Sequence, residues 1–361
     1  MSQETKTFIE STPQSESIYA DLIGSVACRL PLEGALQIDP ESHARHGDVV
    51  LVRVLEVNQE YDALETPEGS ETSLKGGELI VGALGDRQAL HGFSGKPPDH
   101  LVPGVALHLL NKGGVIGECT AFHRDLGWPT KVEYLGTLVH QGRAANLEDF
   151  ALPLKEDPLP DIPLVIVLGT CMDAGKTSVC KKLVSSFSEK GFRINAGKVA
   201  GVASHRDVMA MKKHGAQETL SFHDFGLPST IQLNTLAPIG RSMVHYLAQS
   251  KPHFIVLEMG DGLLGGYHGS SLFKDPEFMK HCMATILCAN DLMGTWGALQ
   301  WMSQLGHQRS PLLVSGRVTD SAEGIRYIED EWHLPAANAF DCAGKICTFV
   351  QESLMPWSKL E

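Results

Sequence analysis

The sequence predicts an α/β protein in which a parallel, doubly wound sheet follows a small all-β barrel or sandwich. Two observations support this fold class. From residue 163 onward, apolar runs of strand length alternate with segments of helical periodicity. Before residue 146, short β-type runs are separated by turns such as 75–77 and 112–114. A chain of 361 residues is long enough for both parts.

Composition and charge argue against several classes of protein. The chain is 43% hydrophobic and 20% charged, which is ordinary for a globular protein. Its net charge is −13, and residues 1–150 alone contain 22 acidic and 11 basic residues. We therefore expect neither a nucleic acid nor an anionic membrane as a partner. The polar N-terminus lacks a secretion signal, no apolar run is long enough to span a membrane, and the eight cysteines form no C-x-x-C pair. A cytoplasmic location is expected.

Four segments are expected along the chain. Dense proline, at Pro153, Pro158 and Pro160, marks a stiff connection that few contacts should cross. The expected segments are a disordered arm at 1–17, a β-barrel or sandwich domain at 18–145, a proline-rich linker at 146–162 and a phosphate-loop domain at 163–361.

The strands and helices follow from periodicity and turn residues. In the first domain we expect strands at 49–55, 79–82, 105–109, 114–117 and 132–139. In the second domain we expect strands at 162–168, 193–200, 254–259, 284–289 and 312–315. Helices are expected at 177–187, 207–214, 238–250, 295–305, 321–331 and 340–354. Ligands of such a sheet lie at the carboxyl ends of its strands, so the residues there are the candidates for a site.

The strongest local signal is the segment 169–177, which fits G-x-x-x-x-G-K-[ST] at every fixed position. It lies between an expected strand and an expected helix, the context in which this pattern predicts a phosphate-binding loop. Backbone N–H groups and the helix N-terminus would face the phosphates. Lys176 would reach the β- and γ-phosphates, Thr177 would bind Mg²⁺, and Asp173 would orient the nucleophile. The predicted nucleotide-binding residues are Gly169, Thr170, Cys171, Met172, Asp173, Ala174, Gly175, Lys176, Thr177 and Ser178.

Three further candidates stand at or just after strand ends. Glu258 follows four apolar residues, as a metal-binding acid of a nucleotide site does. The alternative role for Glu258 is a polar residue that caps the end of the strand. Asp207 is a second candidate for Mg²⁺, and its alternative role is helix capping together with Ser204. Lys198 ends the second strand beside glycine. A lysine there is costly unless it faces water or an anion, so an anionic substrate group is expected.

The phosphate-loop half resembles dethiobiotin synthetase. The loop 169–177 looks like the GT-x5-GKT loop of that family, and 258–262 is similar to its E-G-x-G-G strand end. Segment 293–299 resembles its L-G-x4-A-x-L element. This resemblance implies a P-loop nucleotide-binding fold in which Lys198 holds the carbamate of the substrate and Glu258 binds Mg²⁺. It covers roughly residues 160–355 and leaves the β-domain unmatched.

Two other resemblances are weaker. The stretch from Glu258 to Gly262 with Tyr267-His268-Gly269 is similar to part of the D-glutamate N-acetyltransferase family, another P-loop group. The order of a β-domain before a P-loop domain is similar to that of polynucleotide 5′-kinases, although the acidic charge argues against that function.

We interpret the chain as a Mg²⁺–ATP enzyme of the dethiobiotin-synthetase type. Lys176, Lys198 and Asp173 would be catalytic, and Thr177, Glu258 and Asp207 would bind the metal. The enzyme would activate a carboxylate or carbamate of a small, anionic metabolite for C–N bond formation. The alternatives are a nucleotide-dependent switch acting on a protein partner and a P-loop N-acyltransferase using an acyl-CoA. The sequence does not distinguish ATP from GTP as the nucleotide, and it is compatible with a homodimer.

Overall fold

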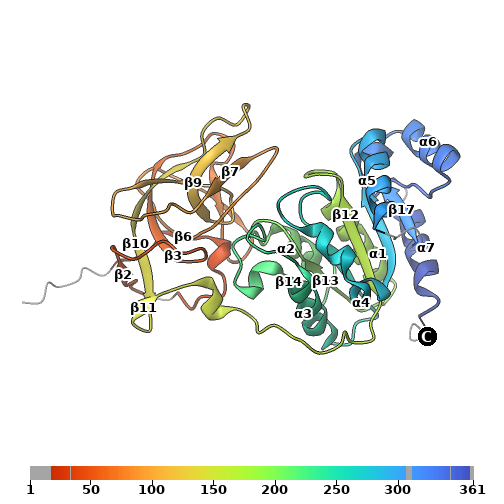
Figure 1. The fold of residues 1–361 in the computed structure, drawn as a ribbon, viewed down its shortest axis with the longest axis horizontal. Helices are drawn as coiled ribbons and strands as arrows, with labels where there is room; N and C mark the ends of the chain where they lie inside the picture. The colour runs from red at the N-terminus through yellow and green to blue at the C-terminus, as the bar shows by residue number, and fades with distance from the viewer. Residues whose placement is uncertain (1–17, 33, 306–310, 342, 358–361) are drawn as a thin grey trace, which may run out of the picture.

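The computed structural model describes residues 18–32, 34–305, 311–341 and 343–357. The expected arm at 1–17 lies outside the described residues. Two halves lie side by side (Figure 1): an N-terminal β-structure, coloured red to yellow, and a C-terminal α/β-structure, coloured green to blue. The predicted fold class is confirmed.

The C-terminal half is built on a six-stranded parallel sheet with the order β14-β13-β15-β12-β16-β17. Its strands are β12 (Leu164–Gly169), β13 (Ile194–Lys198), β14 (Thr219–Ser221), β15 (Phe254–Glu258), β16 (Cys282–Cys288) and β17 (Leu312–Ser315). The central strand β12 is fully buried, as its unbroken apolar sequence predicts for a strand covered on both faces. The phosphate loop therefore leaves the middle of the sheet.

Helices cover both faces of this sheet. The helices are α1 (Lys176–Glu189), α2 (Arg206–Lys213), α3 (Ala237–Ala248), α4 (Pro276–Lys280), α5 (Leu292–Gln304), α6 (Ala322–Trp332) and α7 (Ala343–Leu354). Because side chains alternate along a strand, Val165 and Val167 pack with α1, α2 and α7, whereas Leu164 and Ile166 pack with α3, α4 and α5. The sheet is doubly wound, as the sequence predicts.

The N-terminal half is a closed barrel. Strand β6 pairs with β3, β3 with β10, β10 with β8, β8 with β9, and β9 returns to β6. These strands are β3 (Val49–Glu56), β6 (Leu79–Leu84), β8 (Ala106–Leu109), β9 (Val115–Phe122) and β10 (Lys131–His140). Shorter strands extend or flank the barrel, namely β1 (Leu22–Ile23), β2 (Ile38–Asp39), β4 (Ala63–Glu65), β5 (Glu71–Ser73), β7 (Phe93–Lys96) and β11 (Arg143–Ala144). Closure covers the edges that an open sheet would expose.

The two halves share a packed interface, which differs from the expectation that few contacts cross the linker. Ala203, from the loop after β13, is fully buried in an apolar cluster of the barrel. Asn111 Nδ2 donates a 2.6 Å hydrogen bond to the Ala203 carbonyl. Gly113 lies so close that a Cβ there would be 2.1 Å from that same oxygen. A side chain at position 113 would therefore push the barrel away from the second half.

The proline-rich linker also packs rather than standing free. Tyr246 of α3 donates to the Pro153 carbonyl over 2.9 Å, and the Lys155 amide donates to Ser242 over 2.8 Å. Leu159 and Ile162 are buried in the core on the α3 side of the sheet. In Figure 1 the linker runs along the second half before entering β12. The proline rings fix its course, and the surface of α3 holds it there.

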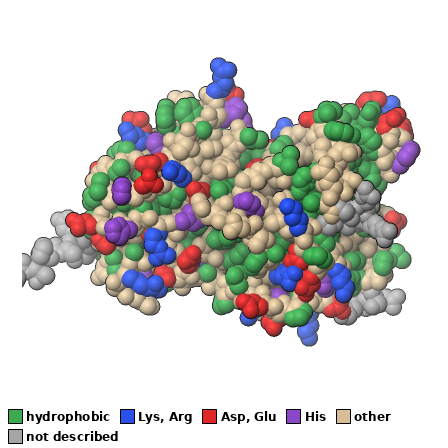
Figure 2. All heavy atoms as spheres, viewed as in Figure 1, with side chains coloured by type: hydrophobic (Ala, Val, Ile, Leu, Met, Phe, Trp, Pro, Cys, Tyr) green, Lys and Arg blue, Asp and Glu red, His purple; other side chains and the backbone are tan. Residues whose placement is uncertain are grey.

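Helix boundaries agree with the predicted ones to within a few residues. Helix α5 begins before the expected residue 295 because Asp291 caps it, and α7 begins after the expected residue 340. The short strands β1, β2, β4, β5, β7, β11 and β14 were not predicted. None of the described helices combines the length and apolarity that crossing a membrane requires. Acidic, basic and hydrophobic side chains are interspersed over the face drawn in Figure 2.

Candidate functional site

The phosphate loop joins β12 to α1, as its sequence predicts. Asp173 and Gly175 both have positive φ, 58° and 102°, which turns the backbone inward before the helix begins. Lys176 is the first residue of α1, and only 7% of it is exposed. Its Nζ donates to the carbonyls of Cys171 over 2.9 Å and Asp261 over 2.5 Å. The ammonium group is thus held over the loop, where phosphates would bind.

Thr177 and Glu258 meet across the site. The Thr177 hydroxyl donates a 2.8 Å hydrogen bond to Oε1 of Glu258, which ends β15 and is 1% exposed. The other carboxylate oxygen, Oε2, is buried and has no partner among the described residues. Burial, reinforced by the carboxylate of Asp207, raises the pKa of Glu258 to about 7. These hard oxygen ligands and the unpartnered Oε2 fit Mg²⁺.

Lys198 and Asp207 form a buried ion pair beside this carboxylate. Lys198 Nζ contacts Oδ2 of Asp207, and both side chains are largely buried. Burial alone would raise the pKa of Asp207, but the attraction of Lys198 outweighs it and lowers that pKa to about 2. Burial likewise acts to lower the pKa of Lys198, but the negative charges of Asp207 and Glu258 outweigh burial and raise that pKa. The sequence predicted separate roles for the two residues, whereas the structure makes each the partner of the other.

A cleft of about 950 Å³ lies over the loop and contains all the predicted catalytic and metal-binding side chains. Its opposite wall comes from the barrel and includes Arg87, Asn111 and Lys112. Arg87 is 4% exposed, its NH1 group donates to the Leu110 carbonyl, and its Nε is buried without a partner in the described chain. The barrel wall also carries Glu60, Glu65 and Glu71, and Lys112 is paired with Glu71 over 2.7 Å. Among the described residues, Arg87 is therefore the cation of this wall that has no carboxylate partner, opposite Lys176 and Lys198.

A third wall of the cleft comes from the loops after β17 and α6. Arg317 lies near the phosphate loop, and its Nε donates to the Asp173 carbonyl over 3.1 Å. Asn338 and Phe340 line the cleft, and Phe340 is 76% exposed. An exposed aromatic ring near the loop is a surface on which a nucleotide base can stack. The sequence did not single out Asn338 or Phe340, because neither belongs to a local motif.

The barrel also holds the start of α2, a contact that the sequence did not predict. Glu65 ends β4 and is 2% exposed. Its carboxylate accepts hydrogen bonds from the Ser204 hydroxyl over 2.7 Å, from the His205 amide, and from the Arg206 amide over 3.2 Å. A carboxylate at a helix N-terminus accepts hydrogen bonds from unpaired amides and interacts favourably with the positive end of the helix dipole. The expected capping role of Ser204 therefore belongs jointly to Ser204 and Glu65.

The glycine-rich stretch after β15 is packed against the barrel. Tyr267 is 3% exposed, and its hydroxyl accepts a 3.1 Å hydrogen bond from the Gln88 amide. Burial raises the pKa of Tyr267 to about 12, so the phenol is neutral. Asp261 adopts a positive φ of 51° and presents its carbonyl to Lys176. This stretch connects the phosphate loop to the barrel.

The sheet order, the phosphate loop between β12 and α1, and the acid at the end of β15 define the C-terminal half as a P-loop NTPase fold. No protein-family model matches the chain, and no curated protein matches it.

Several solved structures are similar to part of the chain. One is the signal recognition particle receptor FtsY from Elizabethkingia anophelis in complex with GDP, at 14% identity and a TM-score of 0.35, covering 50% of this chain and 58% of that one. A DUF1611 family protein from Anabaena variabilis has 14% identity and a TM-score of 0.38, covering 55% and 62%. The kinase domain of the Escherichia coli tyrosine kinase ETK has 12% identity and a TM-score of 0.32, covering 45% and 70%. This chain thus spans less than two thirds of the FtsY and DUF1611 chains.

Proposed function

We propose that the protein is a Mg²⁺–ATP-dependent enzyme that transfers a phosphoryl group to a carboxylate or carbamate of a small, anionic metabolite. The observation that carries this proposal is the Thr177–Glu258 contact, whose Oε2 is buried without a partner among the described residues, in a cleft that also contains Lys176, Lys198 and Arg87. Activation of this kind precedes C–N bond formation in enzymes of the dethiobiotin-synthetase type, which the phosphate-loop half resembles.

The predicted site residues in the cleft each have a role in this reaction. Lys176 and the loop amides bind the triphosphate, and Thr177, Glu258 and Asp207 hold the metal ion, whose charge offsets that of the phosphates. Asp173 lies in the phosphate loop and lines the cleft, where it would orient the nucleophile. Positioning and neutralisation of charge account for most of the catalysis of phosphoryl transfer.

The substrate is held between the two halves. If Asp207 moves to bind the metal ion, the ammonium group of Lys198 would be free to bind the substrate anion. Arg87 offers its unpartnered Nε from the barrel wall. A carboxylate of the substrate would thus satisfy a group that is buried and unpaired in the described structure. The barrel is therefore assigned to substrate binding.

The test is ADP release from Mg²⁺–ATP against a panel of amino-carboxylate and diamine metabolites, with and without bicarbonate. We expect at least one metabolite to stimulate release by the wild-type protein, and Lys176→Ala to abolish that stimulation. Lys182→Ala is the matched control, since Lys182 lies on the exposed side of the same helix. Absence of stimulation by any metabolite would contradict the enzyme proposal.

A nucleotide-dependent switch is the second candidate, and one observation favours it. Glu65 of the barrel caps the helix that begins with Arg206 and Asp207, so movement of Asp207 toward a bound metal would strain a contact between the halves. Such a contact can pass a change at the phosphates to the barrel. Stimulation of turnover by a protein partner, and by none of the metabolites, would favour the switch.

A further inference from the structure

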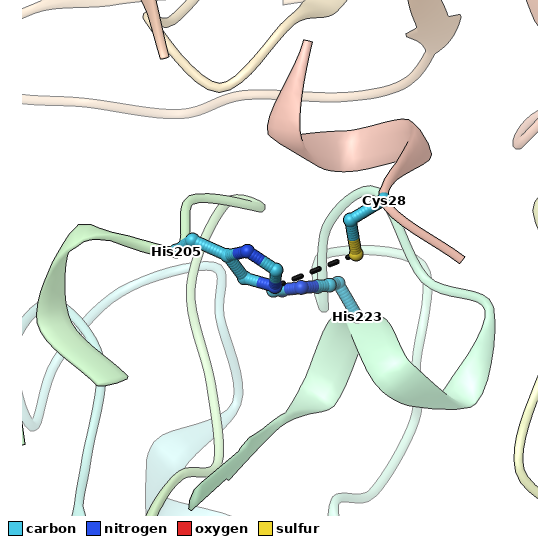
Figure 3. A group of neighbouring side chains, drawn as sticks. All are labelled: Cys28, His205 and His223. Atoms are coloured by element: carbon cyan, nitrogen blue, oxygen red, sulfur yellow. Dashed lines mark hydrogen bonds between the residues drawn. The ribbon is translucent and has the colours of Figure 1, made fainter. Parts of the chain in front are cut away.

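A second cluster of metal-binding side chains lies outside the cleft, where the barrel meets α2. Cys28 follows the 3₁₀ turn η1 (Ser25–Ala27), His205 directly precedes α2, and His223 lies in the turn η3 (Phe222–Phe225). Their candidate ligand atoms all lie within 4.8 Å of one another. Figure 3 shows the three side chains converging from separate segments. None of the three lines the phosphate cleft.

His223 has an unsatisfied ring in this cluster. It is 3% exposed, and both ring nitrogens are buried without a hydrogen-bond partner in the described chain. Buried polar groups without partners are rare, because each loses its hydrogen bonds to water. A metal ion bound between the three side chains would satisfy one of these nitrogens.

His205 is already oriented as a ligand. Its Nδ1 lies 3.0 Å from the Pro67 carbonyl, and since a carbonyl can only accept, Nδ1 carries the hydrogen. The lone pair of Nε2 then points toward Sγ of Cys28, 3.4 Å away. A backbone carbonyl on the second nitrogen is the usual support of a metal-bound histidine. The 3.4 Å spacing matches neighbouring ligand atoms of a tetrahedral zinc site, which are about 3.3–3.8 Å apart for bonds of this length.

We propose that Cys28, His205 and His223 bind one Zn²⁺ ion, with water as the fourth ligand. A thiolate with two imidazoles is a donor set suited to Zn²⁺ and poorly suited to Mg²⁺. The ion would bind when Cys28 loses its proton to solvent, so binding releases one proton. Because Cys28 belongs to the barrel and the histidines to the second half, the ion fastens the two together. His205 stands two residues before Asp207, so the ion also fixes the start of α2.

Cobalt spectroscopy tests the site, because tetrahedral Co²⁺ replaces Zn²⁺ and gives a thiolate charge-transfer band. The untagged full chain is titrated with Co²⁺ in excess Mg²⁺, which competes for the oxygen ligands of the phosphate site. We expect one equivalent to bind with the thiolate band and Zn²⁺ to displace it. Cys28→Ser should remove the band, and His223→Gln should weaken binding more than the roughly 10–100-fold loss typical of supporting residues.

The controls make the outcome decisive. Cys119→Ser replaces another half-buried thiol of the barrel and should leave the band unchanged. If Cys28→Ser or His223→Gln fails to fold by circular dichroism, His205→Gln replaces it, since His205 is only partly buried. The proposal is overturned if the wild-type protein binds no stoichiometric Co²⁺, if the band persists in Cys28→Ser, or if Cys119→Ser removes it equally. Because Lys176→Ala leaves the three ligands intact, it should lose nucleotide binding and keep the cobalt band, which separates this proposal from the proposed function.

Discussion

The hydroxyl of Thr177 donates to Oε1 of Glu258 over 2.8 Å, which joins the first turn of α1 to the end of β15. The two residues are 81 positions apart in the chain and meet because β12 and β15 are neighbours in the sheet. Because Oε2 of Glu258 is buried and has no partner in the described part of the chain, this contact marks the position expected for a metal ion.

Replacement of Glu258 by glutamine should change how stability depends on pH. Burial raises the pKa of Glu258 from 4.5 to about 7, so between these values the folded protein holds a proton that the unfolded chain has released. The contribution of Glu258 to the free energy of unfolding is therefore present at low pH and lost as pH rises through this window. Glu258→Gln should remove that dependence in the nucleotide-free protein.

Urea unfolding of the wild-type and Glu258→Gln proteins at several pH values between 4.5 and 7 measures the difference. If the stability of the variant relative to wild type stays constant over this range, the carboxylate is not titrating there and its assigned environment is wrong.

Lys176→Ala should abolish nucleotide binding and leave the fold intact. The ammonium group hydrogen-bonds the carbonyls of Cys171 and Asp261 and forms no ion pair with a described residue, so its loss breaks no buried ion pair. Equilibrium binding of ATP and GTP, with circular dichroism as the check on folding, measures the effect. Lys182→Ala should bind as the wild type does. Unchanged affinity in Lys176→Ala would show that the loop does not hold phosphates.

Removing one partner of the Lys198–Asp207 pair should lower the stability of the fold strongly. Removing both charges should lower it much less. Asp207→Asn leaves a buried ammonium group without its carboxylate, a loss that is typically about 3–5 kcal/mol. The double variant Lys198→Met, Asp207→Leu should recover much of that stability, because neither charge then remains. Denaturant unfolding of Lys198→Met, of Asp207→Leu and of the double variant gives the coupling. Additive effects would mean that the two side chains do not interact.

Glu65→Ala should destabilise α2 and weaken nucleotide binding together. The substitution removes the carboxylate that accepts from Ser204 and from two amides at the start of α2, a loss of about 1–3 kcal/mol for a buried charged acceptor. Glu68→Ala, an exposed acid three residues further on, is the control and should change neither property. Stability from urea unfolding and affinity from titration should move together. A destabilised variant with unchanged nucleotide affinity would mean that the barrel does not influence the site.

The sequence predicted the parts of the site that depend on local pattern. Lys176 and Thr177 follow from the loop motif, and Glu258 follows from an acid at the end of an apolar strand. Both signals work because the carboxyl ends of parallel strands meet at one edge of the sheet. The closed barrel was predicted only as a barrel or sandwich, since the pairing of β6 with β9 that closes it has no local signature.

Contacts between the halves could not be predicted in this way. Glu65 and Ser204 are 139 residues apart, and Cys28 and His205 are 177 apart, with no spacing pattern to connect them. The partner of Lys198 was also missed, although Asp207 is only nine residues further on. Each residue has a plausible role alone, and only the turn between β13 and α2 brings the two charges together.

The most direct test of the central claim is the Mg²⁺ dependence of nucleotide affinity, measured by titration calorimetry with ATP and with GTP. The site geometry predicts one nucleotide per wild-type chain, bound about 10–100-fold more tightly with Mg²⁺ than without it. Glu258→Gln should lose that gain and keep the affinity measured without Mg²⁺. Failure of the wild-type protein to bind either nucleotide, or an equal gain from Mg²⁺ in Glu258→Gln, would contradict the account.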